Sequence, residues 1–143
     1  MRTTILFALW LAAACSNSGE RSKTYPVSGR LTFKDPQKGN VPVDGARIDF
    51  VPAGENLTAR QRDHAGAITG ADGSYTLQTY APGDGAPPGQ YIVLVTWNKG
   101  GGDGERATGT DRLNGKYNNR NSPVLKAEVK PQSQNQFDFE LNP

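Results

Sequence analysis

The chain has 143 residues, a length that fits a single domain. It contains 17 glycines and 10 prolines, which indicates that turns and loops take up much of its length. The formal net charge is +2, and no basic stripe with interleaved aromatic residues occurs, so we do not expect nucleic acid as a partner. One cysteine and one histidine exclude an internal disulfide framework and a histidine-rich metal site.

The first 14 residues have the pattern of a secretory signal peptide. Arg2 is a short positive region, Ile5 to Leu11 is apolar, and three alanines follow. The apolar run is too short for a helix that spans a membrane. We therefore expect residues 1–14 to be a signal peptide.

The single cysteine, Cys15, directly follows these small residues and precedes Ser16, an arrangement that resembles the bacterial lipobox. The resemblance implies that Cys15 is linked to diacylglycerol and becomes the first residue of the mature chain. The alternative is an ordinary signal peptide cut near Ala14, which leaves a free cysteine. Residues 15–24 are otherwise polar and predict a flexible tether, followed by one domain over residues 25–143.

From Tyr25 onward, apolar residues recur with a period of two, which predicts strands rather than helices. The run 90–97 is apolar on both faces in its middle, which predicts a central strand. The pattern predicts an all-β fold, a seven-stranded antiparallel β-sandwich. The predicted strands are residues 27–34, 46–50, 67–70, 74–80, 90–97, 125–129 and 137–141.

The pair Asp72-Gly73 lies between two of these strands and has three interpretations: a turn, a metal ligand or a catalytic carboxylate. We expect a tight hairpin, because Gly73 can supply a positive φ, and we expect Ile68 and Leu77 to meet across the strand pair. The spacing of a calcium loop is absent, and no catalytic partner is near in sequence. A weak metal role for Asp72 is the remaining alternative. Gly45, which also follows an aspartate, predicts another turn.

Four blocks of the sequence follow one another in a family-like order: "VSGRLTF", "VPVDGARIDF", "TGADGSYTL" and "PPGQYIVLV". They resemble the carboxypeptidase regulatory-like domain, a transthyretin-like (prealbumin-like) β-sandwich, and their turn glycines are Gly45, Gly73 and Gly89. The stretches "PGDGAPPG" at residues 82–89 and "QNQFDFEL" at residues 134–141 also resemble small lipoproteins of planctomycete bacteria. The resemblance implies a non-catalytic accessory module anchored by lipid in the cell envelope, facing the periplasm or the cell exterior. It implies no defined ligand.

Catalytic chemistry has little support in the sequence. No G-x-S-x-G nucleophile elbow occurs, and His64 is the single imidazole. It lies in a polar stretch, where we expect an exposed loop histidine. We therefore expect no catalytic residue, no metal and no cofactor, and a hydrolase is the least supported alternative.

The connection 98–123 exceeds ordinary loop lengths, and such loops tend to be functional or disordered. It is interpreted either as a solvated loop with Tyr117 fixed on the sandwich edge, or as a recognition surface for an envelope glycan or protein. The alternative function is a carbohydrate-binding or adhesion module with Trp97 and Tyr117 as stacking platforms. An exposed coplanar pair of rings would favour glycan binding, and a buried Trp97 a structural role. The candidate binding residues are Trp97, Arg112, Lys116 and Tyr117.

Overall fold

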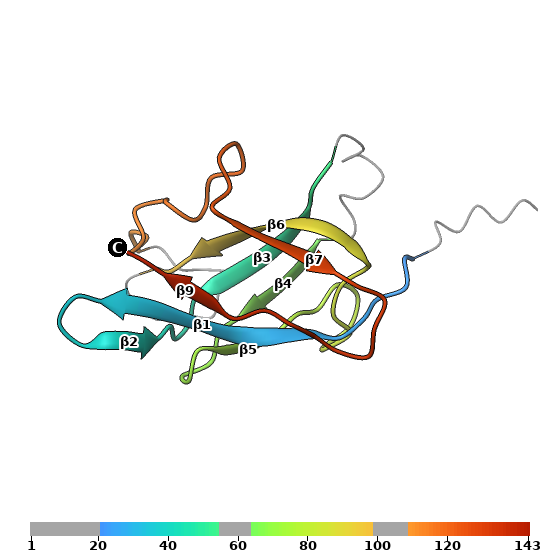
Figure 1. Ribbon diagram of the computed structural model, residues 1–143, viewed down its shortest axis with the longest axis horizontal. Helices are drawn as coiled ribbons and strands as arrows, with labels where there is room; N and C mark the ends of the chain where they lie inside the picture. Colours follow the sequence, from blue (N-terminus) through green and yellow to red (C-terminus); the bar gives the residue numbers. More distant parts are fainter. Residues whose placement is uncertain (1–20, 55–63, 99–108) are drawn as a thin grey trace, which may run out of the picture.

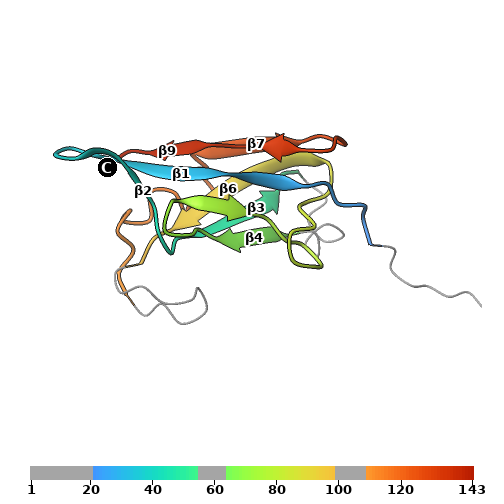
Figure 2. The same ribbon diagram turned by 90° about the horizontal axis from the view of Figure 1, so that it is seen from below.

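The computed structural model describes residues 21–54, 64–98 and 109–143, and these residues form an all-β sandwich of two sheets without helices. The strands run roughly along the long axis of the molecule (Figure 1), and the view along the edges shows the layers they form (Figure 2). Within these three stretches, no helix is long and apolar enough to cross a membrane. The signal segment and Cys15 lie outside the described residues.

The first sheet is built around β1, and its strands pair with β1 rather than with one another. Two strands are antiparallel to β1 and two are parallel to it. Figure 1 shows β2 and β5 along one edge of β1 and β9 along the other. The strands are β1 (Val27–Asp35), β2 (Gly39–Pro42), β5 (Ser74–Thr76), β8 (Asn135–Gln136) and β9 (Phe139–Leu141).

The second sheet has four antiparallel strands in the order β4-β3-β6-β7. β6 pairs with a neighbour on each side, which confirms the central strand predicted from its apolar run. Its first residue is Gly89, at a φ of 150°. The strands are β3 (Arg47–Pro52), β4 (Ala65–Ile68), β6 (Gly89–Thr96) and β7 (Leu125–Val129).

The prediction of seven antiparallel strands is wrong in two respects. The sequence pattern did not predict β2, whose "GNVP" has no alternation. The last segment has two short strands that are divided at residues 137 and 138; only β9 lies within the predicted 137–141, β8 precedes it, and both run parallel to β1. The division has a physical cause, because the N–H of Arg30 donates to Asp138 Oδ1 at 2.8 Å instead of to the neighbouring backbone.

The core lies between the two sheets and is centred on the ring of Phe50. The ring centroids of Tyr91 and Phe137 lie 5.9 Å from that of Phe50, and that of Phe139 lies 6.4 Å away, all at tilted angles. Each large apolar side chain that is fully buried stabilises the fold by about 1.5–3 kcal/mol. The largest fully buried side chains are Phe50, Leu31, Ile48, Leu77, Leu141, Val27, Val43, Val93, Val95 and Val129.

A buried tyrosine in β5 forms a hydrogen bond with the short connection between β8 and β9. The hydroxyl of Tyr75 donates to the carbonyl of Phe137 at 2.6 Å, and the side chain is 4% exposed. Burial raises the pKa of Tyr75 far above its ordinary value, with a smaller contribution from the charge of Asp138. The hydroxyl therefore stays protonated and available as a donor.

The Asp72-Gly73 pair forms a tight turn, as the sequence predicts. Gly73 has a φ of 78°, its N–H donates to the carbonyl of Gly70 at 2.8 Å, and the N–H of Gly70 donates to that of Ser74 at 2.9 Å. This is a three-residue loop with a bulge. The Oδ1 atom of Asp72 accepts from the hydroxyl and the N–H of Ser74, which lowers the pKa of Asp72. Its carboxylate therefore has a structural function in the turn.

The two strands that flank this turn belong to different sheets, and the segments that contain them are joined by an isolated bridge between Gly66 and Gln78. The expectation that Ile68 and Leu77 meet across a strand pair is wrong. Ile68 pairs with Arg47 in the second sheet and is 42% exposed. Leu77 is fully buried, and its N–H donates to the carbonyl of Val27 in β1, a strand of the first sheet. The turn therefore connects the two layers of the sandwich, an arrangement that alternation alone cannot reveal.

Gly73→Ala should lower the free energy of unfolding more than Gly39→Ala. Both glycines have a positive φ, 78° and 74°, but a Cβ on Gly73 would collide with the carbonyl oxygen of Leu31, whereas a Cβ on Gly39 would meet open space. We expect a loss of about 1 kcal/mol for Gly39→Ala and at least about 2 kcal/mol for Gly73→Ala in urea unfolding. Equal losses would contradict the close approach to β1.

Candidate functional site

A concave groove with a volume of about 590 Å³ lies at the end of the sandwich where β1 and β6 finish. Phe33, Val41 and Pro42 give it an apolar side, and Trp97 and Arg112 lie across from the hairpin that joins β1 to β2. In Figure 1 this end lies on the left, at the arrowhead of β1, whereas the chain enters the domain on the right. We call this site the Trp97 groove.

One wall of the Trp97 groove is the tip of the β1–β2 hairpin. The Oδ1 atom of Asp35 accepts the N–H of Gln37 at 2.8 Å and the N–H of Lys38 at 2.9 Å. These two backbone hydrogen bonds are the main reason that the pKa of Asp35 is lowered. Lys38 is thereby held at the groove by its own backbone.

The connection between β2 and β3 forms a second wall, and a buried threonine fixes it. Thr69 is 3% exposed, and its hydroxyl accepts from the N–H of Ala46 at 2.9 Å and donates to the carbonyl of Val43 at 2.5 Å. Gly45 has a φ of 67°, so it is a turn residue as predicted. This backbone presents the carbonyl of Asp44 to the groove.

Trp97 is the residue on which the groove is built. Its indole Nε1–H donates to the carbonyl of Asp44 at 2.9 Å, and its ring is tilted against Phe33 with centroids 5.7 Å apart. The guanidinium carbon of Arg112 lies 4.5 Å from the centroid of the Trp97 ring. The side chain is half-buried, and these contacts fix both its edge and its face.

Asp111 brings the connection after β6 back to Trp97. Its Oδ1 atom accepts the N–H groups of Trp97 and Leu113 at 3.0 and 3.1 Å, and its Oδ2 atom accepts the N–H of Gly115 at 2.8 Å. Asn114 and Gly115 have φ values of 51° and 74°, and the N–H of Lys116 closes this turn on the carbonyl of Leu113. Three donors on one carboxylate therefore set the position of Arg112, the next residue in the chain.

Tyr117 belongs to the core and is not an exposed stacking platform. It is 3% exposed, its hydroxyl accepts the N–H of Asn142 at 2.8 Å, and its carbonyl accepts the N–H of Val95 at 2.9 Å. Lys116 donates to the carbonyl of Pro143 at 2.8 Å. Of the four candidate binding residues, the structure therefore places Trp97 and Arg112 in the groove, and Lys116 and Tyr117 against the end of the chain.

His64 lies just before β4 and outside the strands, as expected of a loop residue, but its side chain is only partly exposed and lies beside β3. Its Nε2 atom lies 3.1 Å from Asp49 Oδ1, and Arg47 Nε donates to Asp49 Oδ2 at 2.9 Å. Burial of the Asp49 carboxyl acts to raise its pKa, but the contacts with His64 and Arg47 outweigh burial and lower it. The imidazole therefore has a charge partner on the outer face of the second sheet.

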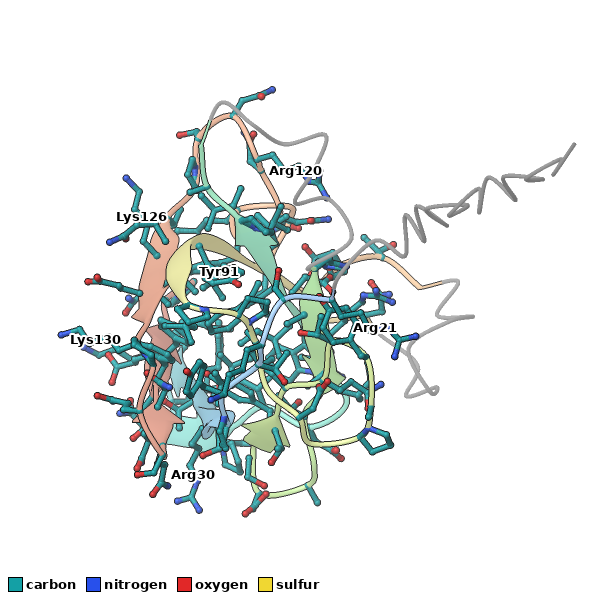
Figure 3. The ribbon with its side chains drawn as sticks, turned by 90° about the vertical axis from the view of Figure 1, so that its right-hand side faces the viewer. Arg21, Arg30, Tyr91, Arg120, Lys126 and Lys130 are labelled. Carbon is teal, nitrogen blue, oxygen red and sulfur yellow. The ribbon has the colours of Figure 1, made fainter. Side chains whose placement is uncertain are left out.

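The basic side chains labelled in Figure 3 do not gather on one surface. This view looks at the end opposite the Trp97 groove, and Arg21, Arg30, Arg120, Lys126 and Lys130 point outward in different directions around its rim. In residues 21–54, 64–98 and 109–143, no group of three or more His, Cys, Asp or Glu side chains could hold a metal ion.

Comparisons with known proteins give likeness of fold alone. No family model and no curated protein sequence matches this chain. One similar solved structure is a candidate carbohydrate-binding protein from Pseudomonas aeruginosa, with a TM-score of 0.46, 11% identity, and coverage of 88% of this chain and 92% of that chain. Another is a 9R-lipoxygenase from Cyanothece PCC8801, with a TM-score of 0.43, 15% identity, and coverage of 85% of this chain but only 16% of that chain.

Asp111→Ala should destabilise the protein and release Trp97 from its position. The change leaves three backbone N–H groups without their acceptor, so we expect a loss of about 1–3 kcal/mol in the free energy of unfolding. Asp84 accepts three successive N–H groups in a turn elsewhere, so Asp84→Ala is a matched control for the stability change. In a Trp10→Phe background, the fluorescence of Trp97 should shift with Asp111→Ala and not with Asp84→Ala. An unshifted spectrum in both would contradict the role of Asp111.

Proposed function

We propose that this chain is a non-catalytic lipoprotein anchored in the cell envelope, where it acts as a structural or binding accessory. The observation that carries the proposal is the placement of the Trp97 groove at the end of the sandwich opposite the entry of the chain (Figure 1). In a domain tethered through Cys15, this groove would therefore lie at the end farther from the point where the tether joins the domain. β1 separates the two ends, and its nine residues span about 30 Å.

The proposal includes membership of the carboxypeptidase regulatory-like, transthyretin-like type, which rests on the four sequence blocks. The first block lies on β1 and the fourth on β6, while the second connects β2 to β3 and the third holds the turn that joins the sheets. Gly45 and Gly73 occupy turns with positive φ values, whereas Gly89, predicted as a turn glycine, is the first residue of β6. Motif and structural role agree at Gly45 and Gly73, which supports the proposal.

A carbohydrate-binding or adhesion module is the second candidate function. The burial of Tyr117 argues against the version in which two aromatic rings form a stacking platform. The Trp97 groove favours a different version, in which a half-buried tryptophan supports polar recognition. The ligand surface of the proposed accessory is therefore this groove.

Cys15→Ser should release the protein from membranes or leave its precursor unprocessed. Stable anchoring needs more than one lipid chain, so the wild-type protein should incorporate labelled fatty acid and sediment with membranes. Ser16→Ala is the matched control, because it changes the neighbouring residue and leaves the thiol. An unlabelled wild-type protein, with the same fractionation for both variants, would overturn the lipid anchor.

Trp97→Ala should reduce the retention of the protein on washed envelope fragments. The experiment uses the Cys15→Ser background, so that the lipid anchor cannot supply the retention. We expect at least about a tenfold loss, because the change removes the support of Arg112 and a wall of the groove. Tyr80→Ala changes an aromatic residue outside the groove and serves as the control. Equal retention of both variants would contradict the assignment of the ligand surface.

A further inference from the structure

The cation stacked on Trp97 indicates the chemistry of the ligand. The guanidinium of Arg112 lies 4.5 Å from the ring centroid, and the backbone N–H of Arg112 donates to the carbonyl of Trp97 at 2.7 Å. Both the backbone and the side chain of Arg112 therefore contact Trp97. A guanidinium that stacks by its face keeps its N–H edge available for hydrogen bonds, and less side-chain freedom is lost when it binds.

Two carboxylates near this cation, Asp111 and Asp35, are engaged in turns, whereas the side chain of Asp44 is exposed in the groove. Among the residues that the structure describes, none forms an ion pair with Arg112. Asp111, its neighbour in sequence, accepts three backbone N–H groups, and Asp35 on the opposite wall accepts two. Lys38 and Arg112, both exposed, are the two cations of the groove. The charge of Lys38 already acts on Asp35, where it helps to lower the pKa of that carboxyl, so Arg112 is the cation that an incoming anion can meet.

The remaining lining defines the rest of the ligand. Phe33, Val41 and Pro42 offer apolar contacts, and Asp44 adds an exposed carboxylate that can accept hydrogen bonds from hydroxyl groups. The volume, about 590 Å³, lies within the range of about 300–1,000 Å³ that small-ligand pockets occupy. A sugar acid combines the three matching features: a carboxylate, several hydroxyl donors and an apolar C–H face.

We propose that the Trp97 groove binds an acidic glycan through a uronic-acid unit, whose carboxylate accepts a pair of hydrogen bonds from Arg112. This inference rests on the proposed function, because it names the ligand class of the same groove. In this arrangement Trp97 positions the cation, and the sugar contacts the apolar side of the groove rather than the indole face that Arg112 covers.

An acidic peptide fits the same groove less well. It would bring successive carboxylates close to Asp35 and Asp44. The nearest edge strand, β2, has only four residues and ends at Pro42, which has no N–H with which to pair an added strand. The chemistry therefore favours an isolated carboxylate among hydroxyl groups.

The experiment is calorimetric titration of the purified Cys15→Ser chain with oligogalacturonate and oligomannuronate, each also supplied after chemical reduction of its carboxyl groups. At least one of the acids should bind and its reduced form should not, and the affinity for the acid should fall as salt is raised. Arg112→Gln should weaken binding of the acid at least about tenfold, and Arg112→Lys should recover part of the loss. Arg120→Gln, which changes an arginine outside the groove, should bind as the parent does. Circular dichroism of each variant verifies its fold.

Three results would overturn the inference. One is equal affinity for an acid and its reduced form, and another is tighter binding of poly-L-glutamate than of either oligouronate. A third is no binding of either acid by a protein whose retention on envelope fragments still depends on Trp97, which would leave the proposed function standing. Retention that does not depend on Trp97 would instead contradict the proposed ligand surface itself, so the two failures are distinguishable.

Discussion

β1 is the strand on which both the fold and the groove depend. Four other strands pair with it, and the carbonyl and N–H of Leu31, at its middle, bond to Val43 and Gly73 where β2 and β5 approach the same edge. An added atom on Gly73 would disturb this junction, because it would strike the carbonyl of Leu31. The same strand begins at the entry of the chain and ends at the groove, so its pairing sets the distance between the two ends of the molecule.

The groove depends on a chain of contacts that starts at one carboxylate. Asp111 gathers three N–H groups, one of which belongs to Trp97, and this places Arg112 over the indole ring. On the other side of the indole, the carbonyl of Asp44 is held by a turn that Thr69 fixes from the core. Several of these contacts join segments far apart in the sequence, and together they connect the body of the sandwich to one half-buried side chain. The position of Trp97 in the groove is therefore fixed by the sandwich itself.

Much of the fold could be predicted from the sequence, because alternation reports directly which residues face a core. It located β1, β3, β6 and β7 well, and gave the central position of β6. It could not reveal β2, which has little alternation, or the parallel pairing of the last strands, which depends on a crossover between sheets. The site was predicted only in part, since the burial of Tyr117 arises from contacts with Val95 and the end of the chain. The pair Leu113 and Tyr117, two large apolar residues in a polar stretch, was the available signal that this segment returns to the core.

Because Arg112 lies over the ring of Trp97, this tryptophan has a different role in binding from that of an uncovered aromatic ring. An uncovered indole would recognise a sugar by its apolar face, whereas a covered one serves as the support for a fixed charge. If a groove that binds through a cation lay close to a bilayer, anionic headgroups would compete with the ligand for that cation. β1 places the Trp97 groove about 30 Å from the end where the chain enters, several times the Debye length of about 8 Å at physiological salt. If the proposals of a lipid anchor and of an acidic ligand are both correct, this separation lets one end of the molecule lie near an anionic membrane while the other end binds an anionic glycan.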